Sequence, residues 1–184
     1  PSYSRMVPAH YVVELALIGC PDPAPKYRRY FTPTRNSLPA DLDVIGRTYI
    51  EALAGVCSDW LDRIGTDEPI GVMFSGGIDS GSVLLVLYHL LLARGQSPAR
   101  LKAFTLSVDD GGADYRQAAE FLASLNLSML LDVIDVPKSA IRYQDAIRVV
   151  EDYKPLDIQA AAMGLALCRG IRARYPDWRY LVDG

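Results

Sequence analysis

The segment Ser75-Gly76-Gly77-Ile78-Asp79-Ser80 brings two glycines, two hydroxyl groups and a carboxylate together within six residues. Adjacent glycines let backbone N–H groups turn inward, because no Cβ stands in the way. A helix beginning here adds unpaired N–H donors and a partial positive charge, which together attract phosphate. The hydroxyls of Ser75 and Ser80 add donors at either side. The segment therefore predicts a phosphate-binding loop.

This loop differs from two common nucleotide-binding motifs. It has no lysine and no GKS or GKT ending, so it is not the P-loop of a kinase or GTPase, and it is not the dinucleotide motif GxGxxG. It places Asp79 at the phosphate-binding turn instead. A bare carboxylate repels phosphate, whereas a divalent cation between the two removes the conflict, so Asp79 is a predicted magnesium ligand. The plainer interpretation is a tight turn in which Asp79 caps a helix.

The elements that must position this loop alternate between strands and helices. Strands are predicted at 70–74, 101–108, 128–136 and 180–182, and helices at 79–94, 113–125 and 158–174. A further helix is predicted from Pro137, in its first turn, to about residue 152. Before them, apolar residues at three- and four-residue steps predict a long amphipathic helix that stops at Gly65. Its stripe comprises Ile45, Tyr49, Leu53, Val56, Trp60 and Ile64.

Strands separated by helices of a dozen or so residues are typical of crossover units. The sequence therefore predicts an α/β fold, an open, mostly parallel twisted sheet with helices on both faces. In such a sheet, ligands bind beyond the carboxyl ends of the strands. The glycine loop follows the nearly continuous apolar run 70–74 directly, which puts it at such an end.

Composition limits the class of protein. Half of the residues are hydrophobic and 22% are charged, which is typical of a globular chain. The net charge of −3 argues against a surface built to bind nucleic acid. The apolar run 83–93 is shorter than the ~20 residues of a membrane-spanning helix. We therefore expect no membrane association. A cytoplasmic location is also expected, because the chain does not open with the charged and then apolar segments of a signal peptide. Cys20, Cys57 and Cys168 are too scattered for a zinc or disulfide framework.

The chain is predicted to have two parts. Residues 1–38 hold many prolines and show no helical period, which favours an extended arm or the edge of a neighbouring domain. Residues 39–184 form the predicted nucleotide-binding domain. The chain begins at Pro1 without methionine and stops at Gly184 directly after an apolar run, so we expect it to be part of a longer polypeptide.

The glycine loop resembles the PP-loop of the ATP pyrophosphatases, and the wider pattern is similar to the synthetase domain of the asparagine synthetase family. This resemblance implies an adenine nucleotide α-hydrolase-like fold. The matching stretches are Val72 to Ser80 for the core motif, Ala103 to Val108 for the second strand, Asp114 to Leu125 for the next helix, Glu151-Asp152-Tyr153 with Ile158 for the E-x-Y segment, and Leu181 to Gly184 for the strand leading into a second acidic loop.

The resemblance also implies the site and its cofactors, ATP and Mg²⁺. Pyrophosphate and magnesium binding would fall to the loop, with Asp79 and Ser80 as the catalytic residues and Asp79 as the metal ligand. Adenine contacts would come from the strand ends, with Phe74 also in the nucleotide site. The residues implied are Ser75, Gly76, Gly77, Asp79 and Ser80 for the loop, Met73, Leu106 and Ser107 for adenine, and Asp183 and Gly184 for the approach from the last strand.

The arm and some departures also bear on the resemblance. The stretches Val7 to Tyr11 and Tyr30 to Pro33 are similar to segments at the end of the family's glutaminase domain and beyond it, which implies such a domain before Pro1. The family's Leu-Gly before its third strand is Leu125-Asn126 here, and the paired histidines often found there are absent. The family's assisting lysine would lie beyond Gly184.

Several other polar residues have two interpretations. Asp109-Asp110 and Gly111-Gly112 follow the second strand, and form either a polar turn or a loop over ATP or the substrate. Glu151 and Asp157 belong either to a solvated connection or to a substrate pocket. His10 and His89 are expected to be structural rather than catalytic.

The function predicted from the sequence is an ATP-dependent ligase. It adenylates a substrate carboxylate, releases pyrophosphate and forms an amide with ammonia or an amine. One alternative is modification of tRNA or a nucleobase, although the basic surface and paired cysteines expected for that class are not seen. Another is a nucleotide-binding module without catalysis. The identities of the acid and the amine stay open, as does assembly into a homo-oligomer.

Overall fold

The computed structural model describes residues 7–15, 24–109, 111–151 and 153–184, which belong to two compact units, Pro1–Ile45 and Gly46–Gly184. In the first unit, β1 (Tyr11–Glu14) and β2 (Lys26–Arg29) pair as an antiparallel hairpin. His10 has a positive φ of 68° and its ring lies 5.0 Å from that of Phe31. Its backbone carbonyl accepts a hydrogen bond from the N–H of Tyr30. His10 therefore takes part in the packing of the hairpin.

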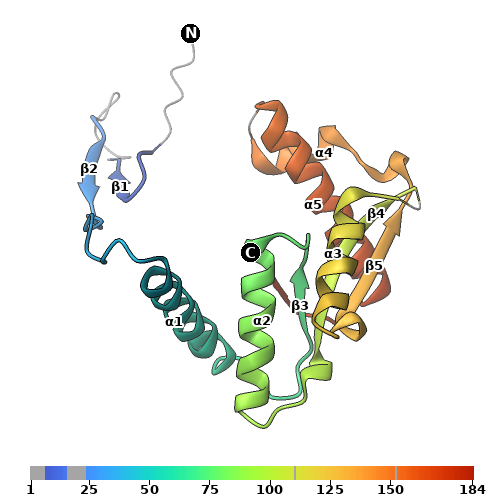
Figure 1. The fold of residues 1–184 in the computed structure, drawn as a ribbon. Coiled ribbons are helices and arrows are strands. Elements are labelled where there is room, and N and C mark those ends of the chain that lie inside the picture. Colours follow the sequence, from blue (N-terminus) through green and yellow to red (C-terminus); the bar gives the residue numbers. More distant parts are fainter. Residues whose placement is uncertain (1–6, 16–23, 110, 152) are drawn as a thin grey trace. The chain divides into compact units, whose positions relative to one another are not determined.

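The second unit is built on a parallel sheet (Figure 1). In the described part of the chain, its strands are β3 (Ile70–Met73), β4 (Leu101–Val108), β5 (Leu131–Val136) and β6 (Tyr180–Val182). Their order is β5-β4-β3-β6, and each neighbouring pair is parallel. The sheet is open, because β5 and β6 each pair on one side. The α/β fold predicted from the sequence is confirmed.

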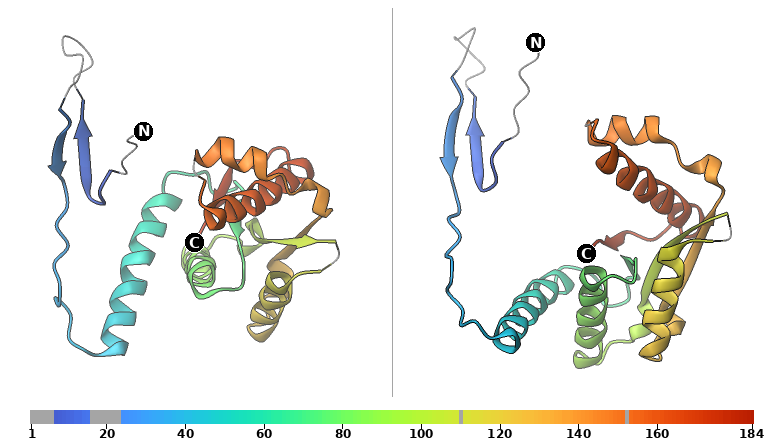
Figure 2. Two further views of the ribbon diagram at one scale, coloured as in Figure 1. Left: turned by 90° about the horizontal axis from the view of Figure 1, so that it is seen from above. Right: turned by 45° about the horizontal axis from the view of Figure 1, so that its top comes forward.

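Helices lie on both faces of this sheet (Figure 2). Among the described residues, the α-helices are α1 (Leu42–Leu61), which begins in the first unit, α2 (Ile78–Ala93), α3 (Ala113–Ser124), α4 (Tyr143–Val150) and α5 (Pro155–Arg174). One core cluster joins residues of α1, α2 and α3 to β3 and β4, and a second joins α5 to β4 and β5. Strand β4 serves both clusters, because its side chains alternate between the two faces.

The turn around Pro137 corrects one predicted element. Pro137 has extended backbone (φ −69°, ψ 149°) and precedes a short 3₁₀ turn, Lys138–Ala140, so the helix that was predicted to include it begins only at Tyr143. Proline does occupy the first turn of a helix at Pro155, where α5 begins. The predicted strand 128–136 is also shorter, because Ser128–Leu130 forms a 3₁₀ turn before β5.

Helix α1 uses only part of its apolar stripe. Leu53, Trp60 and Ile64 pack against the first core cluster, whereas Tyr49 and Val56 are 53% and 68% exposed. The helix ends at Leu61 rather than beside Gly65.

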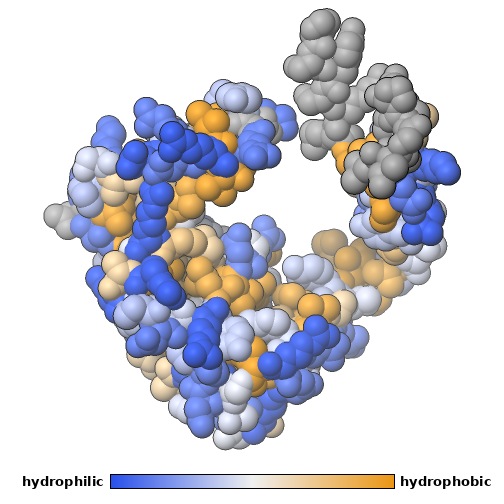
Figure 3. Space-filling view, turned by 180° about the vertical axis from the view of Figure 1, so that it is seen from behind, coloured by the Kyte–Doolittle hydropathy of each residue, from blue (hydrophilic) through white to orange (hydrophobic). Residues whose placement is uncertain are grey.

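Figure 3 shows hydrophobic patches among hydrophilic side chains on one side of the chain. Among the described residues, no helix has the length and apolar character that a membrane crossing requires.

A cluster of charged groups joins the amino ends of β4 and β5 to the end of α5. Asp132 accepts a hydrogen bond from Arg174 at 2.6 Å and another from the hydroxyl of Tyr175, and its Oδ2 lies 3.2 Å from Nζ of Lys102. Burial on its own raises the pKa of Asp132. The hydrogen bonds from Tyr175, Lys102 and Arg174 outweigh that effect and lower the pKa. The cluster lies at the edge of the sheet opposite to the glycine loop.

We expect Asp132→Asn to destabilise the fold by about 1–3 kcal/mol at neutral pH, because it weakens several charge-assisted hydrogen bonds. The folded-state pKa of Asp132 is below its unfolded value, so its stabilisation is present above the unfolded pKa and is lost as pH falls through the folded pKa. Urea unfolding between pH 7 and pH 3 should therefore show a steeper loss in the wild type than in the variant. Asp157→Asn is the control, since its ion pair with Lys154 is exposed. Parallel pH profiles for the wild type and Asp132→Asn would contradict the assignment.

Candidate functional site

The glycine loop leaves β3 at the carboxyl edge of the sheet. The N–H of Phe74 donates to the carbonyl of Phe104 at 2.7 Å, which extends the pairing with β4 by one residue. The chain then turns at Gly76, whose φ is +77°. A Cβ at Gly76 would lie 2.6 to 2.8 Å from backbone atoms of Gln117 and Ala118. The loop thus packs directly against α3, and this position requires glycine both for its conformation and for its contacts.

The two serines of the loop form a loose network of hydrogen bonds. Ser75 Oγ accepts from the N–H of Gly77 at 3.3 Å and lies 3.3 Å from Ser80 Oγ. Ser80 Oγ also donates to the carbonyl of Gly77 at 3.4 Å and accepts from the N–H of Ser75 at 3.4 Å. All these distances are at the long end of hydrogen bonding. The hydroxyls are therefore held in place weakly and can exchange these partners for the oxygens of a ligand.

Helix α2 begins at the loop without a side-chain cap. Gly77 is its N-cap residue, and no side chain among the described residues caps the first turn. The first N–H groups of this helix carry its partial positive charge toward the loop. Asp79 lies exposed in that first turn and does not cap the helix, contrary to the plainer interpretation of the motif. The start of α2 therefore combines anion-binding donors with an exposed carboxylate.

The residues present fit a magnesium ion that arrives with a nucleotide. In the described ranges, no three His, Cys, Asp or Glu side chains gather as a metal cage. Magnesium in nucleotide sites is usually held by one or two carboxylates together with phosphate oxygens and water. Asp79, beside the phosphate-binding donors, has the chemistry for that kind of site.

A cavity of about 470 Å³ lies beside the loop, at the carboxyl edge of β3 and β4. Loop and strand residues form one wall, a side of α5 with small and apolar residues forms the opposite wall, and the end of the chain closes it. Its lining consists of Met73, Phe74, Ser75, Ser80, Thr105, Leu106, Ala160, Ala161, Met163, Gly164, Leu167, Asp183 and Gly184. Most of the residues predicted for the nucleotide site therefore surround one cavity.

The end of the chain lies against the start of α2, as both Figure 1 and Figure 2 show. A Cβ at Gly184 would lie 2.6 Å from Cα of Ser80 and 2.8 Å from its N atom. The N–H of Gly184 donates to Oδ1 of Asp183 at 3.1 Å. Strand β6 thus brings Asp183 and Gly184 to the loop.

Some predicted site residues lie elsewhere. Ser107 is buried and does not line the cavity, whereas Leu106, its neighbour on β4, does. Gly76, Gly77 and Asp79 belong to the loop but are not part of the cavity wall.

The polar residues with two interpretations have structural partners. Asp109 accepts from the N–H of Lys138 at 3.0 Å, which supports a polar turn. Glu151 ends α4 in the left-handed conformation, and Asp157 pairs with Lys154. Asp110, Asp152, Cys20 and the side chain of Asp114 lie outside the residues that the structure describes.

Two groups of cavity residues were missed by sequence reasoning. One is Thr105 on β4, and the other is the α5 wall around Ala160, Ala161 and Gly164. The α5 residues give only a weak signal, since small residues in a helix normally indicate close packing. Thr105 has a better one, because it is a polar residue inside an otherwise apolar part of a central strand.

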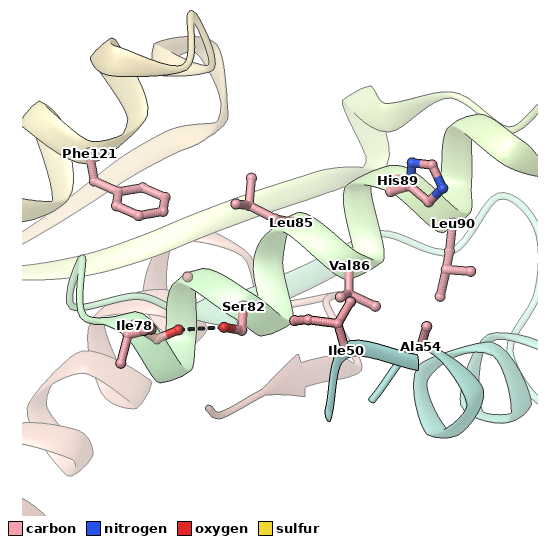
Figure 4. Close-up of a pocket in the computed structure, with 10 residues that line it drawn as sticks. Ile50, Ala54, Ile78, Ser82, Leu85, Val86, His89, Leu90 and Phe121 are labelled. Carbon is pink, nitrogen blue, oxygen red and sulfur yellow. Dashed lines mark hydrogen bonds between the residues drawn. The ribbon is translucent and has the colours of Figure 1, made fainter. Parts of the chain in front are cut away.

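A second cavity, of about 400 Å³, lies between α1, α2 and α3 (Figure 4). Its walls are apolar, with Ile50 on α1, Leu85 on α2 and Phe121 on α3. Ser82 there donates to the carbonyl of Ile78 within its own helix, and His89 is exposed. The described lining of this cavity offers no set of groups for catalysis.

Of the cysteines that the structure describes, Cys57 is buried and Cys168 is partly buried. Burial raises the pKa of Cys57, and burial together with the nearby carboxylate of Asp183 raises the pKa of Cys168. Both thiols are free. A raised pKa keeps a thiol protonated at neutral pH, so neither is suited to act as a nucleophile.

Comparison with known proteins adds to this geometry. A family model described as asparagine synthase matches residues 61–175, which is more than half of the chain. The chain is also similar to a curated protein of Penicillium rubens named amidase chyE, with 29% identity over 156 residues. That alignment covers 78% of this chain and 22% of the relative, so the chain spans about a fifth of the relative's length.

Proposed function

Because the chain belongs to the asparagine synthase family, a family of ATP-using, amide-forming ligases, we propose that it activates a carboxylate with ATP and converts it into an amide. The observation that supports this most is the loop at the start of α2. It joins an uncapped helix start, two weakly held serine hydroxyls and the carboxylate of Asp79 beside one cavity.

The chain's own residues account for the binding and departure of pyrophosphate. The N–H groups at the start of α2 and the hydroxyls of Ser75 and Ser80 would hold the β- and γ-phosphates of ATP. A substrate carboxylate oxygen attacks the α-phosphorus, and the bond from that phosphorus to the bridging oxygen breaks. The same donors stabilise the charge on the pyrophosphate that leaves. Ammonia or an amine then attacks the acyl carbon, loses a proton, and displaces AMP.

Asp79 would be the protein ligand of magnesium in this reaction. When bound, the ion supplies positive charge that shields the phosphates from one another and from the carboxylate. Asp79 itself is exposed at the first turn of α2, next to the donors that hold the phosphates.

The apolar part of the cavity suits the adenine ring. Met73 and Leu106 lie at the strand ends, and Gly164 on α5 lies across from Met73. A Cβ at Gly164 would meet only the Cε atom of Met73, at 3.9 Å, so this space is open. The gap between α5 and β3 therefore leaves room for a flat ring.

We expect Gly164→Leu to raise the Kd for ATP by at least about tenfold, because its side chain would fill the space facing Met73. The fold should tolerate the change, since the added Cβ meets no backbone atom and leucine favours helices. Isothermal titration with ATP and magnesium measures the affinity. Gly55→Leu is the matched control, because Gly55 is also in a helix and a Cβ there meets nothing within 4 Å. Unchanged ATP binding by Gly164→Leu would show that adenine does not bind in this part of the cavity.

The direct test of the function is ATP–pyrophosphate exchange by the full-length protein with magnesium and a panel of carboxylic acids. Exchange that depends on a particular acid is the expected result, followed by amide formation when ammonia or an amine is added. Binding of ATP without exchange for any acid would favour a nucleotide-binding module instead. Amide hydrolysis without ATP, a reaction suggested by the amidase name of the Penicillium rubens relative, would also count against the proposal.

The source of nitrogen forms part of the proposal. The similarity of Val7 to Tyr11 and Tyr30 to Pro33 to segments near a glutaminase domain suggests that such a domain precedes Pro1. Glutamine would then replace ammonia in the amide-forming assay of the full-length protein. Activity with ammonium but not with glutamine would argue against a working glutaminase.

A further inference from the structure

Thr105 lies in the middle of β4, the strand that pairs with β3 on one side and β5 on the other. Leu101 and Ala103, on the same face of the strand, belong to the apolar core beneath α2 and α3. Phe104 belongs to the opposite core, under α5. Side chains alternate along a strand, so Thr105 faces the side covered by α2 and α3, where it is the next residue after Ala103.

The hydroxyl of Thr105 is buried without a partner. The residue is 1% exposed, and among the residues described, its Oγ1 is the buried side-chain oxygen or nitrogen atom that lacks a hydrogen bond. A buried hydroxyl without a partner destabilises a fold, because it has given up its hydrogen bonds to water. Valine has nearly the same shape and suits a strand equally well. Among the described residues, the hydroxyl therefore has no hydrogen bond that offsets the cost of its burial.

The position of Thr105 connects it to the glycine loop. Phe74, which starts the loop, is hydrogen-bonded to the carbonyl of Phe104, the residue before Thr105. Thr105, Ser75 and Ser80 line the same cavity. The serine hydroxyls are held by hydrogen bonds of 3.3 to 3.4 Å, so a phosphate can draw them away from their present partners. A rearrangement of this kind would take place beside the unpaired hydroxyl.

We propose that Thr105 is a positioning residue whose hydroxyl gains its hydrogen bond only when nucleotide phosphates occupy the cavity. This inference rests on the proposed function. In terms of free energy, the hydroxyl destabilises the protein without nucleotide and stabilises the complex with nucleotide. The same group therefore weakens the free protein and strengthens the binding of ATP, which is the pattern expected for a group with differential affinity for two states.

The test is Thr105→Val in the full-length protein, with Thr105→Ser as the conservative variant that keeps the hydroxyl. Urea unfolding without nucleotide and titration with ATP and magnesium are measured for both. We expect the valine variant to unfold at a higher urea concentration than the wild type when nucleotide is absent. We also expect its Kd for ATP to rise about tenfold, as for the loss of one hydrogen bond, and the serine variant to bind within about twofold of the wild type.

Each other outcome overturns the inference in a recognisable way. A valine variant that is less stable without nucleotide would show that the hydroxyl already has a partner in the free protein. A valine variant that binds ATP like the wild type, or a serine variant that binds as weakly as valine, would show that the hydroxyl does not act in binding. A wild-type protein that does not bind ATP would instead refute the proposed function, and this inference with it.

Discussion

Asp79→Ala is expected to lower the rate of ATP–pyrophosphate exchange by at least about a thousandfold, because the variant lacks the proposed protein ligand for magnesium next to the leaving pyrophosphate. The fold should be nearly unaffected, since Asp79 is exposed in the first turn of α2. Its loss there removes only a favourable interaction with the helix dipole, worth about 0.3–1 kcal/mol. Exchange rates and urea unfolding of the same preparation separate the two effects.

The control for Asp79 is Asp43→Ala. Asp43 is also an acidic residue in the first turn of a helix, α1, and it does not line the cavity. The Asp43→Ala variant should lose a similar amount of stability and keep the wild-type rate of ATP–pyrophosphate exchange. An Asp79→Ala variant that still exchanges pyrophosphate at the wild-type rate would exclude Asp79 as the metal ligand.

Gly76→Ala is expected to destabilise the fold by about 2–4 kcal/mol and to abolish ATP binding. Part of the loss arises from the φ of +77°, which costs an alanine about 1–2 kcal/mol. The rest arises because the new Cβ would lie 2.6 Å from the backbone nitrogen of Ala118, so the loop or α3 must shift. Such a shift moves the donors that would hold the phosphates.

Gly95→Ala separates the two causes. Gly95 has a φ of +66°, but a Cβ there meets nothing within 4 Å. It should therefore lose only the conformational part of the energy, about 1–2 kcal/mol, and bind ATP normally. Equal losses of stability at the two glycines, measured by urea unfolding, would show that the contact between the loop and α3 is unimportant.

The sequence was sufficient for the sheet and for the loop because both depend on local patterns. Apolar runs such as Ile70–Met73, followed by glycines and an apolar helix, predict a strand, a turn and a helix without knowledge of the rest of the chain. Pro137 shows the limit of this reasoning. Proline fixes φ but not ψ, so the residue is equally compatible with a helix start and with the extended backbone that it adopts.

Contacts between distant segments could not be predicted in the same way. The stripe on α1 predicts burial, yet Tyr49 and Val56 are exposed, because spacing reports which residues share a face and not what covers that face. Ser107, which the resemblance assigns to adenine, is buried on β4 and is not among the residues that line the cavity. The small residues of α5 became part of the site only through the packing of that helix across the strand ends.

The contact between Gly184 and Ser80 has a consequence for biosynthesis. These residues lie about a hundred positions apart in the chain, so the surroundings of the loop depend on a contact of very long range, a kind that forms late in folding. A chain emerging from the ribosome would expose the whole glycine motif well before β6 could pair with β3. We therefore expect the surroundings of the loop to be completed only after β6 has joined the sheet.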